Sequence, residues 1–224
     1  NMSVAVREWL ASAQLEEPVC LLVGDRRPHV AWSKESIYDP AEVHLPDYLV
    51  DTPETRSHWA RYLTDITGMD EEIGRIHNIA TELFGDDFLF LFTSDHGGQW
   101  PRGKWNLYET GVRIPLIVSW PGRIAKGGRT DAMVSWVDIV PTLIDAAGGS
   151  VPGDIDGRSF LPILDGDGRT HRDRMFTTHT GDKIMNVFPI RSVRIGKYKY
   201  IYNLRADSYF TNHSDRLRKL SLIH

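Results

Sequence analysis

Three residues that could do chemistry stand close together after the apolar run FLFLFT. Asp95 and His96 follow this run almost directly, and Lys104 comes nine residues after Asp95. A carboxylate and an imidazole can bind a metal ion together, while an ammonium group attracts an anion as a point charge. The two glycines of DHGG let the backbone turn tightly and approach a ligand. Taken alone, the same pattern also describes a turn and a solvated surface lysine.

His29 is a second candidate, in the loop RRPHVAW after the apolar run PVCLLVG. If both runs are parallel strands, their carboxyl ends meet at one edge of a sheet, where ligands usually bind. We therefore expect His29 to join Asp95, His96 and Lys104 around one hollow, suited to metal-assisted cleavage of an anionic ester. By itself, a loop histidine is equally a structural residue. The sequence has no HExxH, GxSxG, Walker or GxGxxG motif.

Three apolar runs are predicted to be the strands that position these groups. PVCLLVG (18–24) is a short buried strand that includes Cys20, and FLFLFT (88–93) has no polar alternation, which is typical of a parallel strand covered on both faces. VRIPLIVSW (112–120) is the third and stops at a Pro-Gly pair.

Helices alternate with these strands. Apolar residues recur every three or four positions over 56–84, after Thr52 and Pro53, which supply a capping side chain and a first-turn proline. WVDIVPTLIDAAGG predicts a second helix, with Asp138 as its cap, and the N-terminus predicts an amphipathic one. Together the elements favour the α/β class, as a layered sandwich with a mostly parallel sheet and flanking helices.

The composition of the chain changes after about residue 165. We predict two units: residues 1–165 form an α/β domain, and residues 166–224 form a small α+β subdomain. In the second unit IRSVRI and YKYIYNL flank Gly196-Lys197, which predicts an antiparallel hairpin, and DRLRKLSLIH predicts a short amphipathic helix at the end.

The composition indicates a globular protein without a strong electrostatic preference for a polyanion. Of 224 residues, 41% are hydrophobic and the net charge is -4, so nucleic acid and membrane surfaces are not expected partners. One cysteine excludes an intrachain disulfide framework and a cysteine-built zinc site. Charged residues interrupt the N-terminal segment, which therefore resembles neither a signal peptide nor a membrane span.

A series of sequence blocks resembles the later half of a sulfatase, of the alkaline-phosphatase-like superfamily. The blocks, in the family's order, are PH (28–29), YLTDITGMDEEIGRI (62–76), FLFTSDHGG (90–98), GKWNLYETGVRIPLIVSWPG (103–122), SWVDIVPTLIDAAG (135–148) and DGRSFLPIL (156–164). THTGDKIMNVFPIRSVRIGKYKYIYNL (178–204) further resembles bacterial proteins related to heparan N-sulfatase. The resemblance implies a partial alkaline-phosphatase-like fold and hydrolysis of a sulfated sugar.

The resemblance also implies roles for single residues. Asp95 and His96 match the pair that binds the divalent metal, usually calcium. The family commonly has asparagine where this chain has His96, and because imidazole suits manganese or zinc better than calcium, these two metals are alternatives. Lys104 matches the lysine that contacts the sulfate and the leaving oxygen, and His29 the histidine that hydrogen-bonds the sulfate and protonates the departing group. His179 matches no such motif; it is either a substrate-pocket residue or a turn residue.

Two motifs that the family carries nearer its N-terminus are not found at such a place here: an Asp-Asp pair that completes the metal site, and the Cys-x-Pro-Ser-Arg motif that yields the formylglycine nucleophile; the one Asp-Asp pair of the chain, Asp86-Asp87, lies in the turn after the long predicted helix. The resemblance thus implies a C-terminal piece, weakly active or inactive alone. We expect it to self-associate or to pair with a separate N-terminal polypeptide. Alternatives are a phosphodiesterase or phosphonate hydrolase of the same superfamily, and a non-catalytic remnant that binds a metal or a sulfated glycan.

Overall fold

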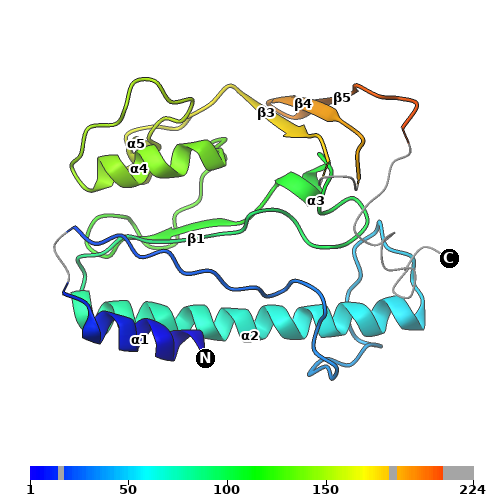
Figure 1. Ribbon diagram of the computed structural model, residues 1–224, viewed down its shortest axis with the longest axis horizontal. Helices are drawn as coiled ribbons and strands as arrows, with labels where there is room; N and C mark the ends of the chain where they lie inside the picture. Colours follow the sequence, from blue (N-terminus) through cyan, green and yellow to red (C-terminus); the bar gives the residue numbers. More distant parts are fainter. Residues whose placement is uncertain (15–17, 182–185, 209–224) are drawn as a thin grey trace.

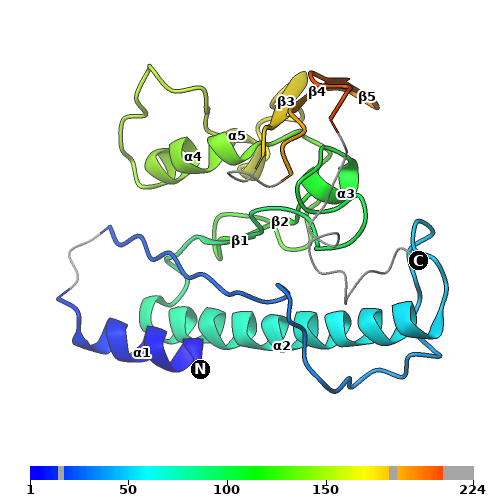
Figure 2. The same ribbon diagram turned by 45° about the vertical axis from the view of Figure 1, so that its right-hand side comes forward.

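The computed structural model describes residues 1–14, 18–181 and 186–208 as three layers and a small sheet (Figure 1). Helices α1 and α2 form one layer, strands β1 and β2 the middle one, and helices α4 and α5 the third (Figures 1 and 2). Strands β3, β4 and β5 form the small sheet, which lies beside α3. The elements are α1 (Met2–Ser12), α2 (Pro53–Phe84), β1 (Phe90–Thr93), α3 (Glu109–Val112), β2 (Leu116–Ser119), the 3₁₀ turn η1 (Trp136–Asp138), α4 (Ile139–Ala146), α5 (Leu161–Leu164), β3 (Arg174–His179), β4 (Ile190–Ile195) and β5 (Tyr198–Asn203).

The long helix α2 confirms the helix predicted from apolar spacing. The Thr52 side chain accepts a hydrogen bond from the Thr55 N–H, Pro53 is the first residue, and Gly85 ends the helix with a φ of 60°. The predicted N-terminal amphipathic helix is also present as α1. It packs on α2 through a core made by Val6, Leu10, Ile76 and Ile79. Among the described helices, none is long and apolar enough to cross a membrane.

The predicted parallel pairing is wrong for the strands that the structure describes. β1 pairs with β2 in the antiparallel direction, with Phe90 opposite Ser119 and Thr93 opposite Leu116. A parallel pair needs a crossover long enough to carry the chain back along the sheet. Here residues 94–115 fold into a loop that contains only the four-residue helix α3. This loop returns to the end where β1 stops, so β2 starts at Leu116 beside Thr93 and runs in the opposite direction. The layered α/β class itself is confirmed by the solved structures compared below.

The predicted strand over residues 18–24 does not form. In the part of the chain that the structure describes, no strand pairs with this segment, and Cys20 is exposed rather than buried. Leu22 is 94% exposed. An apolar run becomes a strand only where a neighbour satisfies its backbone N–H and C=O groups, and that neighbour is missing here.

The C-terminal sheet confirms the predicted hairpin. β4 and β5 pair antiparallel with Ile195 opposite Tyr198, and Gly196 between them has a φ of 53°. β3 pairs with the other edge of β4. The predicted division after residue 165 falls at the end of α5 and stays a prediction, while the helix expected over DRLRKLSLIH lies outside the described residues.

Candidate active site

Asp95 and His96 lie on the loop that follows β1, where the sequence placed them. The Asp95 Oδ1 atom accepts a hydrogen bond from the His96 N–H at 3.0 Å, and Asp95 Oδ2 lies 3.4 Å from His96 Nε2. Asp95 is largely exposed, with 78% of its side chain accessible. The carboxylate is therefore available to a ligand.

The hydrogen bond on the other side of the His96 ring defines which nitrogen can bind a cation. His96 Nδ1 lies 2.7 Å from the Gly97 carbonyl oxygen. Because a carbonyl can only accept, Nδ1 carries a proton, and Nε2 is the ring nitrogen that faces Asp95 Oδ2. Two electron-rich atoms 3.4 Å apart repel each other unless a proton or a cation lies near both. Metal-ligating histidines commonly use one nitrogen in this way while the other donates to a carbonyl.

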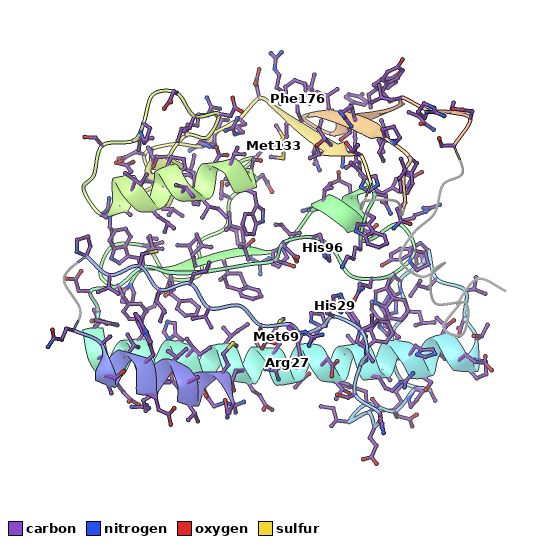
Figure 3. All side chains as sticks on the ribbon, in the orientation of Figure 1. Arg27, His29, Met69, His96, Met133 and Phe176 are labelled. Atoms are coloured by element: carbon purple, nitrogen blue, oxygen red, sulfur yellow. The ribbon has the colours of Figure 1, made fainter. Side chains whose placement is uncertain are left out.

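His29 and Lys104 meet although they are 75 residues apart in the sequence. Lys104 Nζ lies 3.5 Å from His29 Nε2, and His29 Nδ1 lies 2.5 Å from the Val30 carbonyl oxygen. Nδ1 therefore carries a proton, and Nε2 is the atom that faces the ammonium group. In Figure 3, His29 lies between α2 and the loop that carries His96. The predicted gathering of His29 and Lys104 is thus present in the structure.

Four aromatic side chains, here called the aromatic cluster, hold these loops against α2. The indoles of Trp32 and Trp100 stack with their centroids 4.8 Å apart and their planes at 14°. Trp59 and Tyr62 of α2 meet Trp100 edge-on at 5.0 and 5.5 Å. Burial raises the pKa of Tyr62 to about 12. Sequence patterns did not predict this cluster. The i, i+3 spacing of Trp59 and Tyr62 was its only signal, and that spacing does not name the partners in the two loops.

An ion pair braces the start of the His29 loop. Arg27 Nη2 lies 2.6 Å from Asp25 Oδ2, and the Arg27 N–H donates to Asp25 Oδ1 at 2.8 Å. Burial disfavours the charge of Asp25, but the hydrogen bonds from the Arg27 side chain and backbone outweigh this effect, so the pKa of Asp25 is lowered.

Glycines in the loop that carries Lys104 allow two segments of its backbone to approach closely. The Gly97 N–H donates to the Gly111 carbonyl at 2.9 Å. A Cβ added at Gly97 would lie 1.8 Å from the Thr110 carbonyl oxygen, closer than any real contact. The sequence predicts that Gly97 lets the backbone approach a ligand; in the structure it also permits this contact between backbone segments.

We expect the substitution Gly97→Ala to lower the free energy of unfolding by about 3 kcal/mol or more, because the backbone itself would have to move. Urea denaturation would measure it. Gly74→Ala is the matched control. Nothing lies within 4 Å of a Cβ at Gly74, and in the interior of α2 alanine should stabilise by about 0.5–1 kcal/mol. Equal effects of the two substitutions would contradict the role given to Gly97.

Glu109 ties the far end of the Lys104 loop to the C-terminal sheet. Its carboxylate pairs with Arg194 of β4 and, at 2.5 Å, with the Lys199 ammonium of β5. Lys199 also donates to the Leu107 carbonyl at 2.9 Å. Burial opposes the charge of Glu109, but its bonds to Lys199 and Arg194 prevail and lower its pKa.

His179 lies at the end of β3, in different surroundings from the other candidates. Its Nε2 is 3.0 Å from the Asn186 carbonyl oxygen, and its ring packs on Phe188 with centroids 4.5 Å apart. Both partners belong to the C-terminal unit, and the described contacts of His179 join it to none of the other four candidates. Its role in a substrate pocket stays a prediction.

The described residues bring the candidate side chains together as two pairs rather than as one complete site. Asp95 with His96 offers two donor atoms, and in the described part of the chain no group of three or more His, Cys, Asp or Glu side chains could hold a metal ion. His29 with Lys104 offers positive charge. The layered α/β fold and these two pairs match what the sequence led us to expect of an alkaline-phosphatase-like hydrolase.

Comparison with known proteins identifies the family within this class. The sulfatase family profile matches residues 3–150, and the profile "N-sulphoglucosamine sulphohydrolase, C-terminal" matches residues 97–214. The chain belongs to the sulfatase family.

Several relatives cover most of the chain. An ulvan-active sulfatase of Formosa agariphila is 25% identical over 90% of this chain and 41% of its own length. Human N-sulphoglucosamine sulphohydrolase is 30% identical over 77% of this chain and 36% of its own length. The chain therefore spans about two fifths of the length of these relatives.

Solved structures agree with the fold. The structure of BT4656 in complex with its substrate D-glucosamine-2-N,6-O-disulfate superposes with a TM-score of 0.57 at 26% identity, over 71% of this chain and 37% of the other. A phosphonate monoester hydrolase from Silicibacter pomeroyi gives a TM-score of 0.56 at 25% identity, over 82% of this chain and 44% of the other.

Proposed function

We propose that this chain supplies part of the catalytic domain of a sulfatase that hydrolyses a sulfate ester or an N-sulfate on a sulfated sugar. The observation that carries the proposal is the 3.5 Å contact between His29 Nε2 and Lys104 Nζ. Two basic groups brought together from loops far apart in the sequence suit a tetrahedral anion such as sulfate. Relatives that act on sulfated glucosamine and ulvan support a carbohydrate as the carrier of the sulfate.

The pair can stabilise the charge that develops when the bond between sulfur and the leaving atom breaks. Lys104 Nζ holds protons that it shares with His29 Nε2, because Nε2 faces the ammonium group with its lone pair. A sugar oxygen or nitrogen that departs from the sulfate becomes more basic and needs a proton. We assign its delivery to this pair: Lys104 contacts the sulfate and gives up one ammonium proton, which reaches the departing atom through His29 Nε2 and leaves the Lys104 amine neutral.

Asp95 and His96 fit a divalent metal as two of its ligands. Their donor atoms lie 3.4 Å apart, a separation at which both can contact one cation whose bonds are about 2.0–2.4 Å long. The bond from Nδ1 to the Gly97 carbonyl keeps Nε2 available. A bound ion would draw charge from the sulfate oxygens. Calcium is the family's usual metal, and the nitrogen donor also favours manganese or zinc.

The chain alone is proposed to be weakly active or inactive. The Cys-x-Pro-Ser-Arg motif does not occur in it, so no attacking group is assigned to its residues. We propose that the rest of the sulfatase fold, or a second copy of this chain, covers the exposed apolar side chains of Leu22, Ile117 and Val140. Sedimentation that shows a monomer at high concentration would contradict association of the chain by itself.

Titration with inorganic sulfate tests the proposed function directly. With calcium or manganese present, sulfate should shift the side-chain NMR signals of His29 in a saturable way, while D-glucosamine carrying N- and O-sulfate should release little or no sulfate. If His29 does not respond to sulfate with either metal, the proposal fails. In the encoding DNA, an in-frame Asp-Asp and Cys-x-Pro-Ser-Arg upstream would favour a sulfatase over a non-catalytic remnant.

A phosphonate or phosphodiester hydrolase is the second candidate, favoured by the likeness to the phosphonate monoester hydrolase. Both anions are tetrahedral, so the same pair could hold either. Competition between sulfate and a phosphonate monoester for the His29 signal separates the two, because the tighter ligand indicates the class of substrate.

A further inference from the structure

Three consecutive residues, Gly98, Gln99 and Trp100, join the loop of Lys104 to the loop of His29; we call them the link segment. The Gly98 carbonyl accepts the Lys104 N–H at 2.9 Å. Trp100 stacks on Trp32, three residues beyond His29. Gln99, between them, reaches the His29 loop through its side chain.

Gln99 makes the most specific of these contacts. Its Oε1 accepts a hydrogen bond from the Val30 N–H at 2.7 Å, and only 7% of the residue is exposed. Val30 is the neighbour of His29 and also holds the His29 ring, because its carbonyl accepts from Nδ1. The peptide groups of Val30 are thus bound on one side by Gln99 and on the other by the imidazole. A buried amide in such a place fixes position strongly, because a lost partner would leave a polar group without a hydrogen bond.

We propose that Gln99 is a positioning residue that fixes His29 Nε2 opposite Lys104 Nζ. It acts through Val30 and does not itself contact the anion. Stacking of two indoles resists separation of the loops but tolerates sliding in the plane of the rings. The hydrogen bond of Gln99 has a defined direction and length, so it sets the register of one loop against the other. This inference rests on the proposed role of the His29 and Lys104 pair.

The test is a double-substitution cycle with inorganic sulfate as the probe. Gln99→Met keeps the size of the side chain and removes the acceptor. We expect it to weaken sulfate binding about 5- to 10-fold. In the Lys104→Ala background the same substitution should have no further effect, because the geometry that it disturbs no longer matters. If the two substitutions weaken sulfate affinity by factors that multiply in the double variant, the proposal is wrong. It is also wrong if Gln99→Met binds sulfate as tightly as wild type.

Two further measurements separate positioning from general loss of stability. Thr142 is another buried polar residue, in α4, and its Oγ1 accepts a hydrogen bond from the Phe160 N–H. The substitution Thr142→Val should lower the unfolding midpoint without changing sulfate affinity. In the absence of sulfate, the NMR signal of His29 Nε2 should move in Gln99→Met and stay in Thr142→Val. If the His29 Nε2 chemical shift is unchanged in both variants, Gln99 does not position His29. This measurement needs no sulfate, so it tests the positioning role even if the wild-type protein does not bind sulfate and the proposed function is wrong.

Discussion

Replacement of Lys104 by alanine is expected to weaken sulfate binding about 10- to 100-fold. The ammonium group is the fixed positive charge of the pair, and a hydrogen bond from a charged group contributes about 1.5–3 kcal/mol. In any assembly that releases sulfate, kcat/KM should fall further, about 10²- to 10³-fold, because the leaving atom bears most charge in the transition state. Titration calorimetry and sulfate-release rates measure the two quantities.

Two lysine variants show whether the position or only the charge matters. Lys104→Arg keeps the charge but spreads it over a planar fork, so we expect partial recovery of binding. Lys126→Ala removes a charge from the exposed turn after β2 and should leave sulfate affinity unchanged at moderate salt, where distant surface charges are screened. If Lys126→Ala weakens sulfate binding as much as Lys104→Ala, the affinity depends only on the net charge of the protein, and His29 and Lys104 do not form a sulfate-binding site.

Local sequence patterns predicted the helices because their causes are local. Thr52, Pro53 and Gly85 bound α2, and each acts within one turn of its own position. Asp138 is a more instructive case. It was expected to cap the helix predicted over WVDIVPTLIDAAGG, and it stands at the N-cap position of α4. Its side chain, however, accepts a hydrogen bond from the Ser135 N–H, as part of a capping box that begins one turn earlier.

The hairpin of β4 and β5 was predicted correctly because its turn is local, whereas the pairing of β1 and of residues 18–24 was predicted wrongly because it depends on distant partners. The run FLFLFT suggested a parallel strand, yet the direction of β1 relative to β2 follows from the loop between them. PVCLLVG has the composition of a strand and no partner among the described residues. The same limit applies to the site. Residue types pointed to His29 and Lys104, but nothing local indicated Gln99, whose role depends on a hydrogen bond to a residue 69 positions away.

The substitution Asp138→Asn is expected to lower the free energy of unfolding by about 3–5 kcal/mol. Asp138 is fully buried, and its carboxylate accepts from the Arg172 side chain, from the Arg158 N–H at 3.0 Å and from the Ser135 N–H at 2.9 Å. His171 Nε2 lies 3.2 Å from the same carboxylate. A neutral amide would leave the Arg172 charge without its counter-ion inside the protein, which is costly. Urea denaturation at neutral pH measures the change.

The exposed pair of Arg123 and Asp165 provides the matched control, with two hydrogen bonds of 2.8 Å in a solvated place. Asp165→Asn should cost less than about 1 kcal/mol, because water screens and replaces the interaction. Similar losses for the two substitutions would show that burial does not increase the contribution of the Asp138 carboxylate to the free energy of unfolding.

The pH dependence of unfolding distinguishes the charge of Asp138 from its packing. Burial opposes the charge, but hydrogen bonds from Arg172 and from the backbone of Arg158 and Ser135 lower the pKa to about 2, from 3.8 in an exposed carboxyl. Because the pKa is lower in the folded state, the ionised carboxylate stabilises that state, and the contribution is complete above about pH 4. This contribution, about 2–3 kcal/mol, is lost as the pH falls toward 2. Burial also lowers the pKa of His171 below 6.5, so its share of the acid destabilisation begins below about pH 6.5. Asp138→Asn should therefore make the loss of stability between pH 4 and 2 smaller by about 2–3 kcal/mol, while Glu72, whose pKa is also lowered to about 2, keeps its own contribution. An equal loss in wild type and variant would contradict a paired, ionised Asp138.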